Sequence, residues 1–332
     1  MTVEQIRKAV ESKQYDFLRT NPHLGNHIVL LGLSGSHAYG TNIETSDVDI
    51  RGIAGNTREE ILTYHDFEQV EDRPTDTVVF SVNKFISLAS AGNPLFIEML
   101  GLKPEHYIIK TPIGEKLIAN RNLFLSKRIA VTFGGYANQQ LRRLDNKAAR
   151  TVPQPEQEEH IMNSMIHGGE IPNGFRLHIE PSSNPDMEKE IFMDVDVKNM
   201  PLREYLAGLN YLQNVLRAYQ KLGGRNQNAA EHGKLSKHMM HLVRLYFTGI
   251  EILETGNIRT YRDQEHDLLM EIRNGRFLDE EDHPTPEFRE FVDDLSQRFT
   301  EAKNKSMLPD QADMDAITKL RIEINAEIMD AH

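Results

Sequence analysis

The sequence predicts an α+β fold in which a small mixed β-sheet with helices is followed by a mainly α-helical domain. Residues 28–33 and 77–82 are short apolar or β-branched runs, which are typical of strands. Beyond residue 112, apolar residues recur at helical spacing over long stretches. We therefore expect two domains, residues 1–112 and 113–332, the second with a loop and hairpin insertion at about 151–201.

Local patterns place the elements of the first domain. Residues 2–18 are amphipathic and predict a helix that ends before the turn at Asn21-Pro22. The elements that should follow are a strand at 28–33, a sharp turn at Gly35-Ser36 into a short helix, a strand carrying Asp47 and Asp49, a capped helical turn at 56–62, a surface connection at 68–76, a strand at 77–82 and a helix that Gly92 ends.

The second domain should consist of long helices. They are expected at 126–149, 202–222, 236–254, 263–274, 286–303 and 310–330. The segment between the first two is rich in Pro, Gly, Asn and Glu, and predicts a long loop with hairpin strands at 175–179 and 191–197.

Composition limits the class of protein. A chain of 332 residues is long enough for two hydrophobic cores. We expect no membrane span and no secretory leader, because no apolar run of sufficient length occurs. The absence of cysteine excludes disulfides and thiolate zinc sites, and the expected location is the cytoplasm.

The charge distribution bears on partners. A net charge of −12 argues against nonspecific nucleic-acid binding. In two segments the basic residues nevertheless outnumber the acidic ones. Asp145 is the single acidic residue between Arg121 and Arg150, and Glu231 is the single acidic residue between Arg217 and Arg244. Each segment alone could be a solvated helix face, but together they favour an anionic ligand.

The most informative segment runs from residue 30 to residue 52. A buried strand followed by Gly35-Ser36 leaves unpaired backbone amides at a helix start, a place that attracts phosphate. Asp47 and Asp49 are two residues apart, so on a strand both carboxylates point to one face. Such a pair is suited to magnesium, which prefers oxygen ligands.

This order of strand, Gly-Ser turn, short crossover and Asp-x-Asp strand resembles the signature of polymerase-β-like nucleotidyltransferases. More narrowly, residues 35–41 and 46–52 are similar to those of a family of bacterial and phage predicted nucleotidyltransferases, some associated with RNA repair. The resemblance continues through the blocks 92–100, 237–245 and 272–275. It implies a two-metal transfer, with Mg²⁺ or Mn²⁺, of an NMP from an NTP to an acceptor hydroxyl, AMP and ATP being favoured.

A third carboxylate should complete the metal site with Asp47 and Asp49 and accept the proton of the attacking hydroxyl. We choose Asp76, just before the third strand. Glu71 and Asp72 are competitors, and Glu98 could instead be a structural anchor.

Substrate contacts are predicted at Gly35, Ser36, His37, Ser46, Arg51, Lys237, His241 and Arg244. Arg51 could hold a triphosphate oxygen or neutralise the Asp cluster. On the helix from Ser236, Lys237, His241 and Arg244 lie opposite the apolar face, so they could form a solvated stripe or face a cleft.

The expected partners are an NTP and an acceptor. The two basic segments favour an RNA 3′ end, while the overall acidity favours a Tyr, Ser or Thr hydroxyl of a protein. A noncatalytic, antitoxin-like binding partner is a third hypothesis, and a phosphohydrolase, suggested by His266-Asp267, a distant fourth. The sequence does not decide between a monomer and a homo-oligomer.

Overall fold

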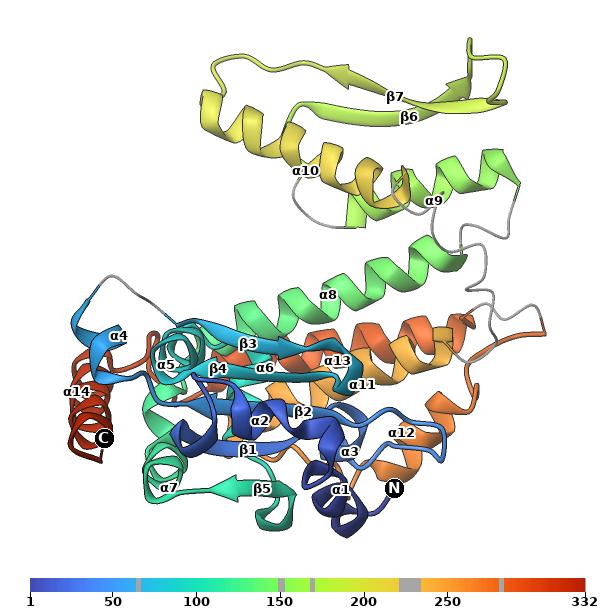
Figure 1. Cartoon of the computed structure of the whole chain (residues 1–332). Helices are drawn as coiled ribbons and strands as arrows, with labels where there is room; N and C mark the ends of the chain where they lie inside the picture. The colour runs from blue at the N-terminus through green and yellow to red at the C-terminus, as the bar shows by residue number, and fades with distance from the viewer. Residues whose placement is uncertain (64–66, 149–152, 168–170, 221–233, 281–283, 332) are drawn as a thin grey trace. The chain divides into compact units, whose positions relative to one another are not determined.

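The computed structural model describes residues 1–63, 67–148, 153–167, 171–220, 234–280 and 284–331 (Figure 1). They divide into two compact units. The first unit comprises Met1–Tyr136, Val243–Met270 and Val292–His332, and the second comprises Ala137–Leu242 and Glu271–Phe291. This partition does not follow the expected boundary at residue 112, because C-terminal segments return to the first unit.

The first unit contains a five-stranded mixed sheet, and the predicted α+β class is confirmed. Its strands are β1 (Ile28–Ser34), β2 (Asp49–Ala54), β3 (Gln69–Asp72), β4 (Thr77–Ser81) and β5 (Tyr107–Lys110). Their order is β3-β4-β2-β1-β5, with β2 and β4 parallel and the other neighbours antiparallel.

Three expectations about the sheet need correction. The second strand begins at Asp49, so Asp47 lies outside it. Residues 68–76 are not only a surface connection, because Gln69–Asp72 pairs with β4. The strand Tyr107–Lys110 was not predicted, since four residues give too short an alternation to recognise.

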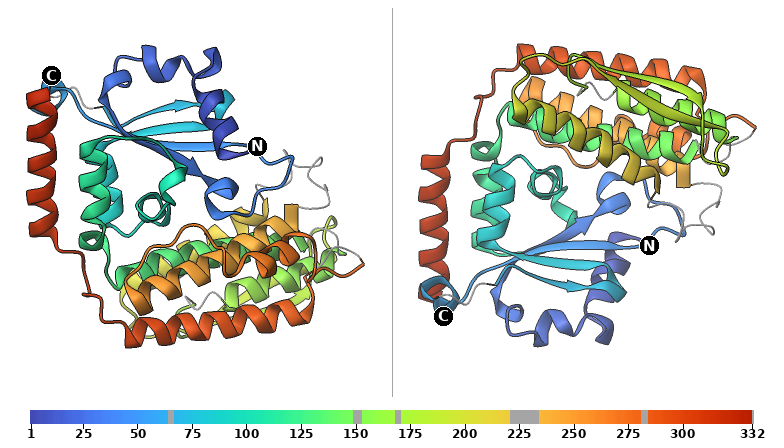
Figure 2. Two further views of the ribbon diagram at one scale, coloured as in Figure 1. Left: turned by 90° about the horizontal axis from the view of Figure 1, so that it is seen from below. Right: turned by 90° about the horizontal axis from the view of Figure 1, so that it is seen from above.

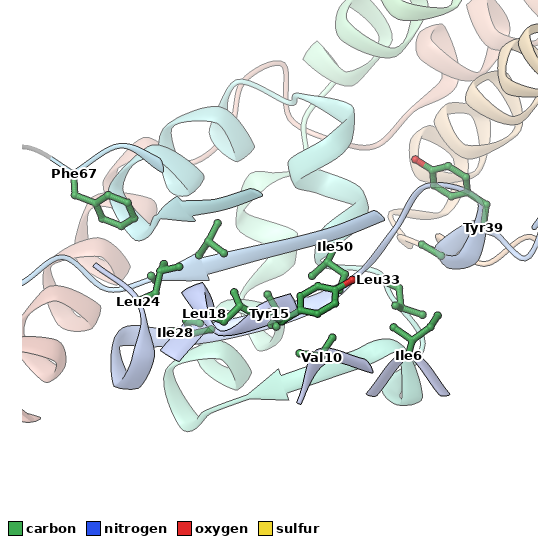
Figure 3. Close-up of a cluster of buried hydrophobic side chains, with 14 residues drawn as sticks. Ile6, Val10, Tyr15, Leu18, Leu24, Ile28, Leu33, Tyr39, Ile50 and Phe67 are labelled. Atoms are coloured by element: carbon green, nitrogen blue, oxygen red, sulfur yellow. The ribbon is translucent and has the colours of Figure 1, made fainter. Parts of the chain in front are cut away.

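One face of the sheet is covered by the N-terminal helices (Figure 3). The expected helix over residues 2–18 is broken into α1 (Val3–Val10), η1 (Lys13–Tyr15) and α2 (Phe17–Thr20). Their apolar side chains form one core with residues of β1, β2 and β4. That core includes Ile6, Val10, Tyr15, Leu18, Leu31, Leu33, Ile50 and Val79.

The opposite face carries α5 (Val82–Ser90), α6 (Pro94–Met99) and α7 (Pro112–Ala119) (Figure 2). The rings of Phe80 and Phe96 lie 4.8 Å apart on this side. Since Leu33 and Ile50 belong to the first face, strand alternation directs Asp49 and Arg51 to this second face.

The remaining elements are mostly helical. They are α3 (Gly35–Tyr39), α4 (Arg58–Leu62), α8 (Arg128–Ala148), α11 (Lys234–Thr255), α12 (His266–Arg273), α13 (Pro286–Lys305), α14 (Met314–Ala331) and the 3-10 turns η2 (Gly25–His27), η3 (Arg73–Thr75), η4 (Pro104–His106) and η5 (Arg121–Phe124). In the first unit, α14 packs against α4 and α5 (Figure 2). No helix within the described ranges is both long and apolar enough to span a bilayer.

The second unit contains the predicted hairpin and a helix that was not predicted. The strands are β6 (Phe175–Pro181) and β7 (Lys189–Val195), followed by α10 (Leu202–Gln220). The expected loop from residue 151 was wrong in part, because Gln154–His167 forms α9. This helix exists because Ile161 and Met165 pack on Tyr211, Leu212 and Val215 of α10, a tertiary contact that outweighs its polar composition.

Candidate functional site

The site begins at the turn between β1 and α3. Gly35 has a φ of +57°, in the left-handed region that favours glycine. A Cβ at this position would lie 1.9 Å from Oδ2 of Asp49. The register of the sheet pairs Ser34 with Asp49, which brings the turn and the carboxylate together. The predicted sharp turn at Gly35 is therefore present, and its glycine lets Asp49 approach the backbone.

Asp49 and Asp76 lie side by side at the starts of two parallel strands. Ile50 of β2 is in register with Thr77 of β4, and the Ile50 amide donates to the Asp76 carbonyl at 3.2 Å. The two carboxyl groups are within hydrogen-bonding reach of each other. The sequence reasoning that selected Asp76 as a neighbour of Asp49 thus agrees with the sheet topology.

Arg51 pairs with Asp76. Its Nη2 lies 3.0 Å from Oδ1 of Asp76, and its Nη1 donates to the Asp76 carbonyl at 2.6 Å. Partial burial would raise the pKa of Asp76, but its hydrogen bond with Asp49 and the Arg51 guanidinium outweigh it and hold the pKa below its usual range. Arg51 thus neutralises Asp76 in this structure, and the triphosphate contact weighed for it stays a prediction.

The backbone at Asp76 is also unusual. Asp76 has a φ of +43°, where a residue with a side chain is uncommon. Asp72 caps the preceding turn, because its Oδ2 accepts from the Thr75 amide at 3.1 Å. Glu71 pairs with Arg73 at 3.3 Å. Among the three acidic candidates in this segment, Asp76 is therefore the one whose carboxylate meets Asp49.

Asp47 and Ser46 precede β2. Asp47 is exposed, and Ser46 Oγ accepts from the Ile43 amide at 2.8 Å within a turn. No group of three or more His, Asp or Glu side chains in the described parts of the chain is arranged to hold a metal ion. The structure thus supplies a carboxylate pair, and the part of Asp47 as a further ligand stays a prediction.

The pair nevertheless fits a divalent cation. Two adjacent carboxyl groups repel each other when both are ionised, so a cation between them would be stabilising. Carboxylate oxygens are the ligands that Mg²⁺ prefers, and the exposed side chain of Asp76 leaves room for the waters that this ion retains.

Ser36 and His37 are buried in α3. Burial lowers the pKa of His37, the positively charged N-terminus acts in the same direction, and a contact with the Asp47 backbone opposes them. The imidazole is therefore neutral at pH 7. Neither side chain is exposed to solvent, so substrate contacts at these positions stay predictions.

The basic stripe expected on α11 is only partly present. Lys237 is exposed and His241 is half-buried, both in the second unit. Arg244 does not lie on a solvated face: it is buried in the first unit, with its Nη1 2.5 Å from Oε1 of Glu98. The helical wheel missed this because it cannot show that α6 brings a buried carboxylate to that side. Glu98 is thus a structural anchor.

Much of the two basic segments falls outside what can be described. The side chains of Arg142, Arg143 and Lys147, and the whole of Arg150 and of residues 221–233, lie outside the described residues. Lys127 forms an ion pair with Asp310 at 3.2 Å. The anionic ligand inferred from these segments stays a prediction.

Part of the chain matches a known protein family. Residues 6–168 match the family described as RNA repair pathway DNA polymerase beta family, RlaP. No curated protein and no solved structure matches the chain significantly. The matched segment contains Gly35, Asp49, Asp76 and Glu98, whereas Arg244 lies beyond it.

Proposed function

The chain belongs, through residues 6–168, to the RNA repair pathway DNA polymerase β family of polymerase-β-like nucleotidyltransferases, and from this premise we propose a specific reaction. We propose that it transfers AMP from ATP to the hydroxyl of an RNA end, with Mg²⁺ or Mn²⁺ as the cofactor. The observation that carries this proposal is the pairing of Asp49 with Asp76, with Gly35 against Asp49.

In this proposal each residue has a chemical role. Asp49 and Asp76 would hold metal, with Asp47 as a third ligand from the exposed segment before β2. Divalent ions, when bound, stabilise the negative charge on the entering and leaving oxygens of phosphoryl transfer. Asp76 would accept the proton of the attacking hydroxyl, because its lowered pKa keeps it ionised at neutral pH. Arg51 would then offset the charge of the triphosphate.

Two observations support RNA as the acceptor. The matched family is described by its part in RNA repair, and the two basic segments of the sequence suit a polyanion. The net charge of −12 favours the alternative, a protein hydroxyl. A salt titration separates them, because log affinity for a nucleic acid falls against log salt by roughly 0.7–0.9 for each phosphate contact. A shallow slope would favour the protein acceptor.

The proposal is tested by label transfer. Wild type is incubated with Mg²⁺ or Mn²⁺, each of the four α-labelled NTPs, RNA with a free 3′ end, and cell lysate. The variants are Asp49→Asn and Asp76→Asn, and the matched control is Asp267→Asn, whose carboxylate is 100% exposed. We expect label from ATP on RNA, a loss of at least about a hundredfold in both site variants, and wild-type activity in the control.

Other outcomes change the conclusion. Label on protein that the same two variants abolish would replace the RNA acceptor with a protein acceptor. Label from another NTP would mean that the transferred nucleotide is not AMP. If wild type transfers no label to either acceptor with either metal, the chain is a noncatalytic binding partner. Release of phosphate that only Asp267→Asn abolishes would favour a phosphohydrolase at His266-Asp267.

A further inference from the structure

Three buried side chains of the first unit, one of them from α3, contact one another and form a cluster. Tyr39 comes from α3, Glu98 from α6 and Arg244 from α11, and the side chains of Glu98 and Arg244 are 6% and 5% exposed. The Tyr39 hydroxyl donates to Glu98 Oε2 at 3.0 Å, and Arg244 Nη1 donates to Glu98 Oε1 at 2.5 Å. The Arg244 guanidinium carbon lies 3.6 Å from the centre of the Tyr39 ring. Each member thus contacts both others.

This cluster specifies geometry more than it adds stability. A buried ion pair loses its hydration, and apolar side chains of similar volume are often at least as stabilising. Apolar side chains could not reproduce two directed contacts of the cluster. Glu98 accepts a hydrogen bond from the Tyr39 hydroxyl, and the guanidinium of Arg244 lies over the Tyr39 ring. Glu98 is itself held, because its carbonyl accepts from Thr260 Oγ1 at 2.6 Å.

Tyr39 links the cluster to the carboxylate pair. It ends the same five-residue helix, α3, that Gly35 begins. Burial raises the pKa of Tyr39; Arg244 opposes this, while the charges of Glu98 and Asp49 add to it. The hydroxyl therefore stays protonated as a donor. The helix is anchored again after Tyr39, whose carbonyl accepts from the Arg262 amide at 3.0 Å.

Resting on the proposed function, we propose that Arg244 is a positioning residue for the metal site, acting through Glu98 and Tyr39 on the turn that holds Asp49. Its buried guanidinium is not open to a triphosphate, so this role replaces the substrate contact expected from the sequence. Residue 244 lies outside the matched segment 6–168, so the C-terminal part of the chain contributes to the precision of the site.

Two variants test the proposal. Tyr39→Phe removes only the hydroxyl that Glu98 accepts. The double variant Glu98→Gln/Arg244→Met removes both charges together, so no unpaired ion is left buried. The matched control is Tyr107→Phe, because Tyr107 is also buried and its hydroxyl also donates at 3.0 Å, but to the Met99 carbonyl. Control and test thus each lose one buried tyrosine hydroxyl and its 3.0 Å hydrogen bond, and only the test variant loses a bond to a charged acceptor.

The readout is Mn²⁺ binding to the full-length protein, with free Mn²⁺ counted by electron paramagnetic resonance and no nucleotide present. We expect Tyr39→Phe and the double variant to bind Mn²⁺ at least about tenfold more weakly than wild type, the effect usual for groups that orient metal ligands. Tyr107→Phe should bind within about twofold of wild type.

The outcomes separate the two proposals. Wild-type affinity in Tyr39→Phe would overturn the positioning role and leave the proposed function standing. Equally weakened Mn²⁺ binding in Tyr107→Phe would also overturn the positioning role, since the loss of any buried tyrosine hydroxyl would then be enough to weaken Mn²⁺ binding. No Mn²⁺ binding by wild type would overturn the metal-dependent function and this inference with it. If the double variant does not fold, Tyr39→Phe alone decides.

Discussion

The carboxylate of Asp49 lies directly against the α-carbon of Gly35, at a distance that no side chain at position 35 would allow. A Cβ there would lie 1.9 Å from Asp49 Oδ2. The contact joins the end of β1 to the start of β2 and fixes where the carboxylate of Asp49 points. It also makes the candidate site unusually sensitive to the smallest substitution.

Gly35→Ala should impair both stability and metal-dependent activity. Alanine at a φ of +57° costs about 1 kcal/mol or more, and its methyl group would displace Asp49. The control is Gly135→Ala on the exposed side of α8, where a Cβ meets no atom within 4 Å. It should stabilise the protein by about 0.5–1 kcal/mol. Urea unfolding and label transfer measure both effects, and a fully active Gly35→Ala protein would contradict the close contact.

The charge state of Asp76 should depend on Arg51. Although burial opposes it, the hydrogen bond with Asp49 and the guanidinium of Arg51 hold the pKa of Asp76 below the ordinary aspartate value of about 3.9. Arg51→Gln should therefore move the NMR titration of the Asp76 carboxyl to higher pH. Because the folded pKa is depressed, the stabilisation exists above the unfolded pKa and is lost as pH falls through the folded pKa.

The same linkage predicts a pH-dependent stability difference. Wild type should exceed Arg51→Gln in free energy of unfolding at neutral pH, and the two should converge as the pH falls below the folded pKa of Asp76. A difference that grew on acidification would show that Arg51 acts on another group.

Arg262 should be important for stability. Its side chain is 1% exposed and pairs with Glu251 and Glu265. Arg262→Met would leave two partly buried carboxylates with less compensation, and we expect a loss of about 3 kcal/mol in the free energy of unfolding. Arg276→Met breaks the exposed pair with Glu271 and should cost less than about 1 kcal/mol. Urea unfolding of both variants makes the comparison, and equal losses would refute the special role of burial.

Lys237 tests whether α11 contacts nucleic acid. The side chain is exposed, so Lys237→Gln should change the free energy of unfolding by less than about 0.5 kcal/mol. If Lys237 contacts an RNA phosphate, the variant should bind RNA more weakly, with a salt slope lower by about 1. Lys305→Gln, at the exposed end of α13, is the control and should leave both binding and slope unchanged. An unchanged slope in Lys237→Gln would remove Lys237 from the interface.

The local sequence was sufficient for the features that depend on neighbours in the chain. Gly35 is needed where a strand turns sharply into a helix, and the short apolar run of β1 and the β-branched run of β4 mark them as strands, so both could be predicted from short segments. The α+β class followed from these runs together with the helical periodicity beyond residue 112. Boundaries set by pairing could not be predicted: Asp47 was expected on the second strand, but β2 begins at Asp49.

The features that depend on distant segments were decided only by the tertiary structure. Asp76 meets Asp49 because β2 and β4 are parallel neighbours, and the same adjacency allows the ion pair of Arg51 with Asp76. Arg244 has the sequence pattern of a solvated face, yet it is buried because Glu98, 146 residues away, compensates its charge. A single sequence shows which groups are charged, but burial and pairing are properties of the folded chain, where low polarity makes each unpaired charge costly.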